Sequence, residues 1–167
     1  MFNLKNKTAL VTGASGGIGE AIAEALHKQG AKVCITGTNE SKLNNINQKS
    51  SMSYSQIICN LNKRDELKNL VSNVEKEIGN IDILVNNAGI TKDQLTMRMS
   101  EESWDDVLET NLYASFYLSK SVIRNMMKKK FGRIIQISSV VGFTGNPGQA
   151  NYVASKAGLI GMTKSLA

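Results

Sequence analysis

Short runs of apolar and β-branched residues alternate along the chain with longer segments of helical periodicity. The strand-like runs cover residues 8–12, 32–36, 56–60, 83–86 and 133–138. In one intervening segment, Leu67, Val71, Val74 and Ile78 recur at the spacing of a single helix face. Strands that alternate with amphipathic helices form right-handed β-α-β units around a parallel sheet. The pattern therefore predicts an α/β fold of Rossmann type, a doubly wound parallel sheet with helices on both faces.

The segment after the first strand shows the same periodicity. Ile18, Ile22 and Leu26 are expected to share the buried face of a helix, with Ala21 and Ala25 beside them.

The second half of the chain predicts longer helices. Residues 101–130 contain no strong helix breaker, so one or two consecutive helices are expected there. A further helix is expected to begin near Asn151, after the turn signal around Pro147, the single proline of the chain. The 167 residues, 41% of them hydrophobic, contain no repeat or linker, so residues 1–167 are expected to form a single domain.

The composition of the chain bears on its cellular location and on whether a disulfide or a metal site is expected. There is no run of 18 apolar residues and no signal-peptide pattern, so we expect a soluble cytoplasmic protein without a membrane partner. Cys34 and Cys59 lie in strand-like runs, and no spacing links them to each other or to the lone His27. Neither a disulfide nor a metal site is expected.

The formal net charge of +6 favours acidic partners in general. Nucleic acid is not expected, because no nucleic-acid-reading motif accompanies the charge. The densest basic stretch, residues 128–133, comes at the expected end of a long helix, where the helix dipole favours cations.

A glycine-rich turn follows the first strand and leads directly into a helix. Residues 12–19 read TGASGGIG, with glycines at 13, 17 and 19. Glycines permit a tight turn and a close backbone approach, and the helix N-terminus then offers free N–H groups to a pyrophosphate. We expect a dinucleotide cofactor to contact the following residues of this turn: Gly13, Ser15, Gly16, Gly17, Ile18 and Gly19.

The end of the second strand bears on the choice of cofactor. Folds that prefer NAD usually place an acidic residue here, against the ribose 2′-hydroxyl. Gly37 and Thr38 occupy the position instead, and Glu40 is expected in the first turn of the next helix with Asn39 as its N-cap. This leaves room for a 2′-phosphate, with Thr38 as a hydroxyl contact, and favours NADP over NAD.

A tyrosine and a lysine in the last expected helix are candidates for acid–base chemistry. Tyr152 and Lys156 are four residues apart and so share one helix face. An ammonium group beside a phenol stabilises the phenolate, so Lys156 would tune Tyr152. Tyr152 would then donate a proton to a carbonyl oxygen during reduction, while Ser139, after the fifth strand, donates a hydrogen bond to the developing oxyanion. Ser138 is expected to point to the opposite face.

These residues, together with Asn111 and the Asn-Asn-Ala-Gly motif at 86–89, stand in the order typical of the classical short-chain dehydrogenase/reductase family, which the whole chain resembles. The resemblance implies that Asn111, Ser139, Tyr152 and Lys156 form a catalytic tetrad. It implies that Asn111 holds a proton-relay water and that Lys156 also binds the nicotinamide ribose. The remaining implied cofactor contacts are Asn60 and Leu61 at the adenine, the Asn87-Ala88-Gly89 motif beside the sheet, and Tyr152.

Several segments further resemble the bacterial 3-oxoacyl-[acyl-carrier-protein] reductases within that family, among them residues 87–99, 132–135, 139–142 and 148–152. This resemblance implies NADPH as the hydride donor, a homotetramer with a long-helix interface, and acyl carrier protein as the partner. Lys129, Lys130 and Arg133 would then be candidates for docking the acidic carrier. One departure is Gly16, which stands where many NADP-dependent relatives carry an arginine.

Two other functions stay open. One is a short-chain reductase acting on a small ketone, steroid or sugar alcohol, and the other is a dinucleotide-binding protein without turnover. Family members also continue beyond residue 167 through two more strands and a substrate lid, whereas this sequence stops at Ala167 without a helix stop signal. If these 167 residues are the whole protein, we expect poor folding or no turnover.

Overall fold

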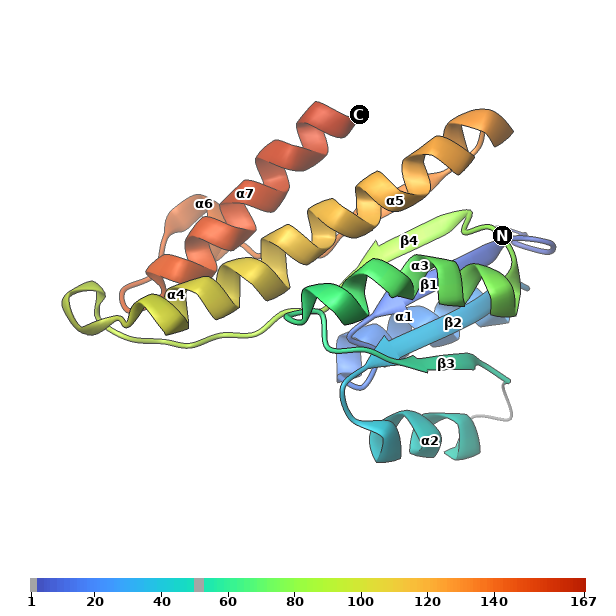
Figure 1. Cartoon of the computed structure of the whole chain (residues 1–167), viewed down its shortest axis with the longest axis horizontal. Coiled ribbons are helices and arrows are strands. Elements are labelled where there is room, and N and C mark those ends of the chain that lie inside the picture. Colours follow the sequence, from blue (N-terminus) through green and yellow to red (C-terminus); the bar gives the residue numbers. More distant parts are fainter. Residues whose placement is uncertain (1–2, 50–52) are drawn as a thin grey trace.

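Five parallel strands form a central sheet in the order β3-β2-β1-β4-β5 (Figure 1). The structure, a computed structural model, describes residues 3–49 and 53–167. The strands are β1 (Thr8–Thr12), β2 (Lys32–Gly37), β3 (Ser55–Ile58), β4 (Ile83–Asn86) and β5 (Arg133–Gln136). The parallel sheet confirms the predicted α/β Rossmann-type fold.

Helices connect the strands. They are α1 (Gly17–Lys28), α2 (Glu40–Lys49), α3 (Arg64–Ile78), the 3-10 turn η1 (Thr96–Arg98), α4 (Glu101–Leu108), the π-helix η2 (Glu109–Tyr113), α5 (Ala114–Lys129), α6 (Val141–Thr144) and α7 (Ala150–Leu166). None of the helices within the described residues is long and apolar enough to cross a membrane.

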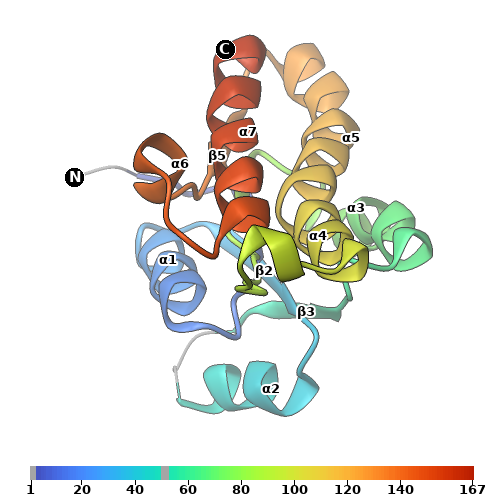
Figure 2. The same cartoon turned by 90° about the vertical axis from the view of Figure 1, so that its left-hand side faces the viewer.

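The alternation of side chains along each strand builds two apolar cores, one on each face of the sheet. Leu10 and Leu84, paired across β1 and β4, pack with α3 and α5. Val11 and Val85, the next pair in the register, pack with α1 and α2. Figure 2 shows α1 and α3 on opposite sides of the strands. Because both faces are covered, the central residues of the inner strands are apolar on both faces, as is typical of parallel sheets.

Two strands end earlier than predicted. β3 stops at Ile58 and β5 at Gln136, although the sequence predicted strands to 60 and 138. Each pairs with a single neighbour and loses its partner there. The last ladder-like bonds run from Cys59 N to the Gly37 oxygen and from Ile137 N to the Asn86 oxygen, both 3.0 Å, after which the neighbouring strands end.

The prediction for the buried face of α1 was wrong in part. Ile22 and Leu26 pack against the core, but Ile18 is 65% exposed, and Gly19 and Ala23 are the buried residues. Ala21 and Ala25 are also exposed. The first turn of α1 lies at the carboxyl end of the sheet, where no strand remains for Ile18 to pack against.

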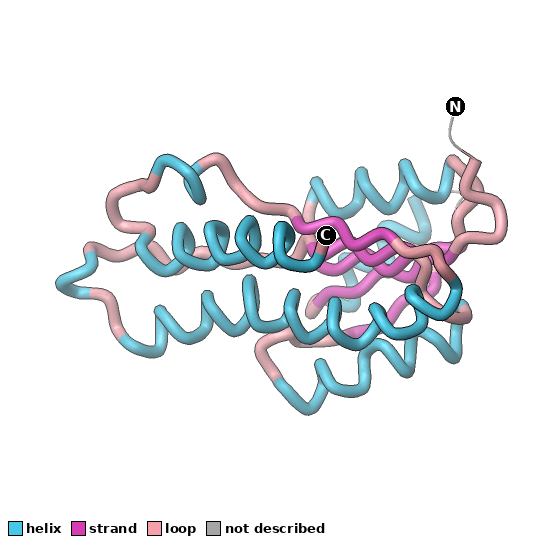
Figure 3. Tube along the Cα trace, turned by 90° about the horizontal axis from the view of Figure 1, so that it is seen from above, coloured by secondary structure: helices cyan, strands magenta, loops and turns pink. Residues whose placement is uncertain are grey.

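The predicted helical run over 101–130 is continuous through α4, η2 and α5, with one wide turn at η2. The last helix begins at Ala150, as predicted, and contacts α4 and η2. Seen from above, α7 and α5 run side by side (Figure 3). The short helix α6 was not predicted, because its four residues are too few for a periodic pattern.

Candidate cofactor cleft and catalytic group

A cleft of about 620 Å³ opens at the carboxyl ends of the strands. It lies where the strand order reverses between β1 and β4, the position at which open α/β sheets bind their ligands. Twelve of the predicted cofactor residues line it: Gly13, Ser15, Gly16, Gly17, Ile18, Gly19, Thr38, Asn60, Leu61, Asn87, Ala88 and Gly89. The other two, Tyr152 and Lys156, are not part of its lining.

Backbone geometry explains the glycines of the turn. Gly13 has φ +64°, and an added Cβ would lie 2.6 Å from the Ala88 Cα. A Cβ on Gly19 would lie 2.6 Å from both the Asn87 side-chain nitrogen and the Gly13 oxygen. At Gly17, by contrast, a Cβ would meet nothing within 4 Å. Two glycines therefore permit close packing, and the third faces open space.

The N-terminus of α1 is free to bind an anion. Its N-cap, Gly16, has no side chain to bond the first amides, so the end of the helix presents N–H groups and a positive dipole end. The hydroxyl of Thr36, which also lines the cleft, is buried and has no hydrogen-bond partner among the described residues. An open helix end, a buried donor and a glycine-lined wall fit the pyrophosphate and ribose of a dinucleotide.

The motif after β4 holds the glycine turn in place. The side-chain amide of Asn87 donates to the carbonyl oxygens of Thr12 (2.9 Å) and Gly13 (3.1 Å). In return, the hydroxyl of Thr12 accepts from the backbone N–H groups of Asn87 (3.1 Å) and Ala88 (3.0 Å). These bonds join the ends of β1 and β4 directly beside the cleft.

The turn after β2 confirms the predicted cap. Asn39 Oδ1 accepts a hydrogen bond from the backbone N–H of Lys42 (2.9 Å), so α2 begins at Glu40. Gly37 carries no carboxylate, and a Cβ there would lie 3.0 Å from Ser15 Oγ, so a larger residue would require the Ser15 side chain to shift. The wall of the cleft at this point therefore contains no carboxylate from residue 37.

Seven residues that line the cleft were missed in the sequence: Thr36, Gly37, Lys42, Cys59, Asn62, Ile90 and Thr110. Most are immediate neighbours of predicted residues, so an extension of each motif by one position would have found them. Lys42 is different, because it enters the wall from the first turn of α2. No local pattern in the sequence indicated this position.

Tyr152 and Lys156 share one face of α7, as predicted. Lys156 Nζ lies 5.5 Å from the centre of the Tyr152 ring and donates a hydrogen bond to the Ile137 carbonyl oxygen (2.7 Å). Lys156 is only 4% exposed, and burial lowers the pKa of its ammonium group. The charge therefore lies between the end of β5 and the Tyr152 ring.

Asn111 lies on the wide turn η2 and is fully buried. Its side chain bonds both backbone groups of Ile90: Oδ1 accepts from the N–H (2.8 Å) and Nδ2 donates to the oxygen (3.0 Å). A Cβ on Gly89 would lie 3.3 Å from Asn111 Oδ1 and 3.5 Å from Lys156 Nζ. Gly89 thus allows the amide and the ammonium to approach the inner end of the cleft. Such π-turns are frequent at functional sites.

The two serines after β5 have different roles in the packing. Ser138 Oγ donates to the Lys156 carbonyl oxygen (2.9 Å), which anchors α7 to the sheet. Ser139 Oγ accepts a weak bond from Val141 N (3.4 Å). Within the described residues, no hydrogen bond joins Ser139 to Tyr152, and none joins Asn111 to Tyr152 or Lys156.

Asn151, next to Tyr152, fastens the start of α7. It is fully buried, and its side-chain amide donates to the carbonyl oxygens of Lys92 (3.1 Å) and Ser103 (2.9 Å). Gln149 Nε2 also donates to Asp93 (2.8 Å). The loop after Gly89 is therefore tied to α7, and Tyr152 is held by contacts from several elements.

Both cysteines are buried thiols. Burial, reinforced by Glu77, raises the pKa of Cys34 to about 12, and burial with Glu66 raises that of Cys59 to about 11. In residues 3–49 and 53–167, no group of three or more His, Cys, Asp and Glu side chains could hold a metal ion. Cys59 therefore lines the cleft as a neutral group.

The sequence comparisons agree with this fold and site. The family described as short chain dehydrogenase matches residues 7–167. The chain belongs to this family, and it is therefore an oxidoreductase of the nicotinamide-dependent class.

Among curated proteins, the chain is 55% identical over 167 residues to the 3-oxoacyl-[acyl-carrier-protein] reductase of Rickettsia bellii, covering all of this chain and 68% of that protein. It is 53% identical over 166 residues to the enzyme of the same name from Salmonella typhimurium, covering 99% of this chain and 68% of the relative. It is also 55% identical over 167 residues to nodulation protein G of a Rhizobium species, with coverage of 100% and 68%.

Proposed function

We propose that this protein reduces 3-oxoacyl groups on acyl carrier protein to 3-hydroxyacyl groups, a step of fatty-acid biosynthesis in the cytoplasm. NADPH, when bound in the cleft, would supply the hydride. The single observation that carries the proposal is the group at the inner end of the cleft, where buried Lys156 lies beside both Gly89 and the Tyr152 ring. The names of the relatives, among them that from Rickettsia bellii, support the substrate class.

Each member of the tetrad has a distinct task in this proposal. Tyr152 donates its phenolic proton to the carbonyl oxygen, and the Lys156 ammonium stabilises the phenolate that remains. Ser139 donates a hydrogen bond to the oxygen as negative charge develops on it. Asn111 holds the loop at Ile90 in place and positions a proton-relay water near Lys156.

The proposed cofactor contacts divide along the cleft. Gly13, Ser15, Gly16, Gly17, Ile18 and Gly19 would hold the pyrophosphate, and Asn60 and Leu61 would contact the adenine. Thr38 would meet a 2′-phosphate. At the nicotinamide end, Asn87, Ala88, Gly89, Tyr152 and Lys156 would contact the ribose and ring. We further propose that residues 1–167 fold as one nucleotide-binding domain.

The test is NADPH oxidation with acetoacetyl-acyl carrier protein, followed by the loss of absorbance at the nicotinamide band. It compares the 167-residue chain and a chimera extended by the C-terminal part of the Rickettsia bellii relative, each with and without Tyr152→Phe. We expect the chimera to turn over and Tyr152→Phe to lower its kcat by about a hundredfold or more, with NADPH binding retained.

The comparison also separates the alternatives. A chimera that binds NADPH but oxidises it on no 3-oxoacyl substrate would be a dinucleotide-binding protein without turnover. Turnover on acetoacetyl thioesters without carrier, unchanged by adding carrier, would favour a reductase of small ketones. Equal turnover of Tyr152→Phe and the parent chimera would remove Tyr152 as the acid.

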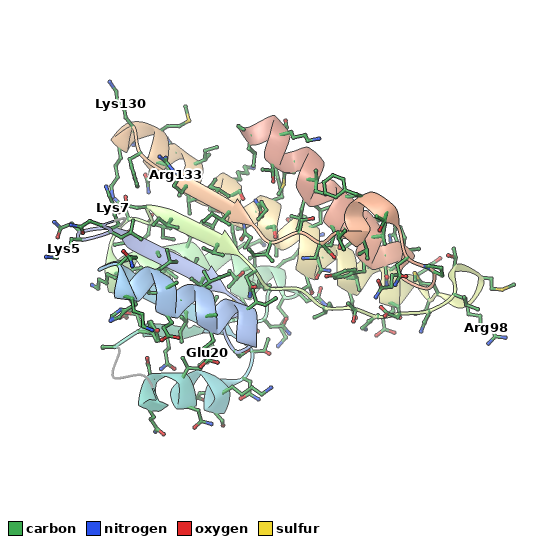
Figure 4. All side chains as sticks on the ribbon, turned by 180° about the vertical axis from the view of Figure 1, so that it is seen from behind. Lys5, Lys7, Glu20, Arg98, Lys130 and Arg133 are labelled. Atoms are coloured by element: carbon green, nitrogen blue, oxygen red, sulfur yellow. The ribbon has the colours of Figure 1, made fainter. Side chains whose placement is uncertain are left out.

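The basic docking residues lie at the far end of the sheet from the cleft. Lys130 follows α5 and Arg133 begins β5, and Figure 4 shows both at the end opposite Arg98. Lys129 is already engaged, since its ammonium contacts the buried carboxylate of Asp82 at 2.9 Å. We therefore assign carrier docking to Lys130 and Arg133 and a structural role to Lys129.

The proposed homotetramer has support from the exposed face of the long helical run. Trp104 is 40% and Phe116 45% exposed, and a cavity of about 280 Å³ lies between Leu108, Leu112 and Phe116. Exposed apolar side chains along one helical run suit an interface between helices of two subunits. Phe116→Glu should shift the mass measured by light scattering toward smaller assemblies, whereas an unchanged mass would place the interface elsewhere.

A further inference from the structure

The wall of the cleft between the glycine turn and α2 contains a lysine, Lys42, that has no ion-pair partner among the described residues. Lys42 borders the main cleft and also an adjoining cavity of about 150 Å³ that includes Ser15 and Glu20. Lys42 therefore lies between the turn that begins α1 and the turn that follows β2. The same cleft is lined by Gly16, the position at which many NADP-dependent relatives carry an arginine.

The backbone fixes where Lys42 begins, while its ammonium stays available. Asn39 caps α2 through the Lys42 N–H, and the next residue, Leu43, is fully buried against β2. In contrast, Lys42 is exposed and makes no ion pair among the residues that the structure describes. The packing of Leu43 sets the position of its backbone, and its charge has no ion-pair partner among the described residues.

The surrounding groups favour an anion over a ribose hydroxyl. Gly37 carries no carboxylate, and Thr36 leaves a buried hydroxyl without a partner among the described residues. Glu20 is the carboxylate of the adjoining cavity and projects from α1 (Figure 4), but it makes no ion pair with Lys42. A phosphate monoester carries nearly two negative charges at neutral pH, so it attracts the ammonium more strongly than one carboxylate does.

We propose that Lys42 binds the 2′-phosphate of NADPH and makes this protein select NADPH over NADH, in the role that an arginine at position 16 has in other chains. The inference rests on the proposed dinucleotide binding and adds the residue that decides the cofactor. Thr38, which lines the same cleft, would share the phosphate.

Equilibrium binding measurements test the assignment of Lys42 without requiring turnover. Dissociation constants for NADPH and NADH, and for adenosine 2′,5′-bisphosphate and 5′-AMP, are measured by titration calorimetry for the wild type and Lys42→Ala. We expect Lys42→Ala to weaken NADPH and the bisphosphate about tenfold, the effect of one charge-assisted hydrogen bond, and to leave NADH and 5′-AMP unchanged. Raising the salt concentration should weaken wild-type NADPH binding more than NADH binding.

Two further variants complete the test. Lys68→Ala removes the same charge from α3, outside the cleft, and should change neither cofactor. Gly16→Arg in the Lys42→Ala background should restore NADPH affinity, since a Cβ at position 16 would make only an ordinary contact, 3.7 Å from the Gly13 oxygen. Equal weakening of both cofactors by Lys42→Ala, or none, overturns the assignment while dinucleotide binding stands. A wild type that binds neither cofactor overturns the proposed function together with it.

Discussion

Lys156 Nζ donates a hydrogen bond to the carbonyl oxygen of Ile137, with 2.7 Å between the two atoms. The bond links the centre of α7 to the residue that follows β5. Since Ser138 bonds the Lys156 carbonyl in return, the helix and the strand end are joined twice at the same residue. The backbone at the end of β5 therefore holds the Lys156 ammonium in place.

The buried ammonium predicts a dependence of stability on pH. Burial lowers the pKa of Lys156 from its ordinary value of 10.5, so between the lowered value and 10.5 the unfolded chain binds more protons than the folded chain. The free energy of unfolding therefore gains a contribution that rises with pH across this window. The Lys156→Met variant lacks this pH-dependent contribution. In urea unfolding, the difference between wild type and Lys156→Met should move in favour of the wild type from about pH 7 to about pH 10.

Lys164→Met, an exposed position on the same helix, serves as the control and should give a curve parallel to the wild type. Parallel curves for Lys156→Met as well would contradict the burial of the charge.

Asn111 predicts a stability effect with a matched control on the same helical run. Asn111→Ala leaves both backbone groups of Ile90 without their partner and should lower the free energy of unfolding by about 1–3 kcal/mol. Asn125→Ala removes only a half-buried bond to Glu75 and should cost about 0.5 kcal/mol or less. Chemical denaturation measures both, and similar losses at the two positions would show that the clamp on Ile90 contributes little.

The glycine turn predicts opposite outcomes at two neighbouring glycines. Gly13→Ala combines φ +64° with a contact of 2.6 Å to Ala88, and it should destabilise the fold by about 2 kcal/mol or more. Gly17→Ala has open space around the new methyl group and should leave the thermal midpoint within about 2 °C of the wild type. A tolerated Gly13→Ala would mean that the backbone at this turn shifts away from Ala88.

The ion pair at the end of α5 predicts different effects for adjacent lysines. Burial alone would raise the pKa of Asp82, but hydrogen bonds from Lys129 and Thr8 outweigh it and hold the pKa below its ordinary value. Lys129→Ala leaves this carboxylate unpaired and should cost about 1–3 kcal/mol, whereas Lys130→Ala should change stability by about 0.5 kcal/mol at most. Lys130→Ala should instead raise the KM for the carrier-bound substrate. The reverse pattern would reassign the two lysines.

The contribution of Asp82 should also disappear in acid. A carboxyl whose folded pKa lies below its ordinary value stabilises the fold above that value, and the stabilisation is lost as the pH falls through the folded pKa. Asp82→Asn should therefore show a smaller loss of stability than the wild type between about pH 5 and about pH 2. If the difference in the free energy of unfolding between Asp82→Asn and the wild type stays constant over this pH range, the charge of Asp82 is not the source of the effect.

The pattern of the sequence was sufficient for most of the fold because local periodicity and burial coincide in a parallel sheet. Strands β1 and β4 were predicted to the residue, and all four apolar positions of α3 are buried as expected. Errors arose where the end of an element depends on a neighbour. β3 and β5 stop because their partners stop, and Ile18 is exposed because α1 begins beyond the sheet.

The site shows the same division. Motifs in the sequence identified twelve residues of the cleft, because glycines, a helix start and a strand end have local signatures. No local signature indicates that Asn111 clamps Ile90, that a wide turn carries it, or that Lys42 enters the wall from α2. Each of these depends on contacts between segments far apart in the chain.

The sequence by itself determined the alternation of strands and helices along the chain and the position of the glycine turn. It also determined the spacing that puts Tyr152 and Lys156 on one helix face. These features follow from periodicity and backbone sterics within a few residues. Only the tertiary structure decided which cations are engaged and which are available. Lys129 is paired with Asp82, whereas Lys42 has no such partner in the described chain. A side chain's charge is free or neutralised according to what folding brings within a few ångströms of it.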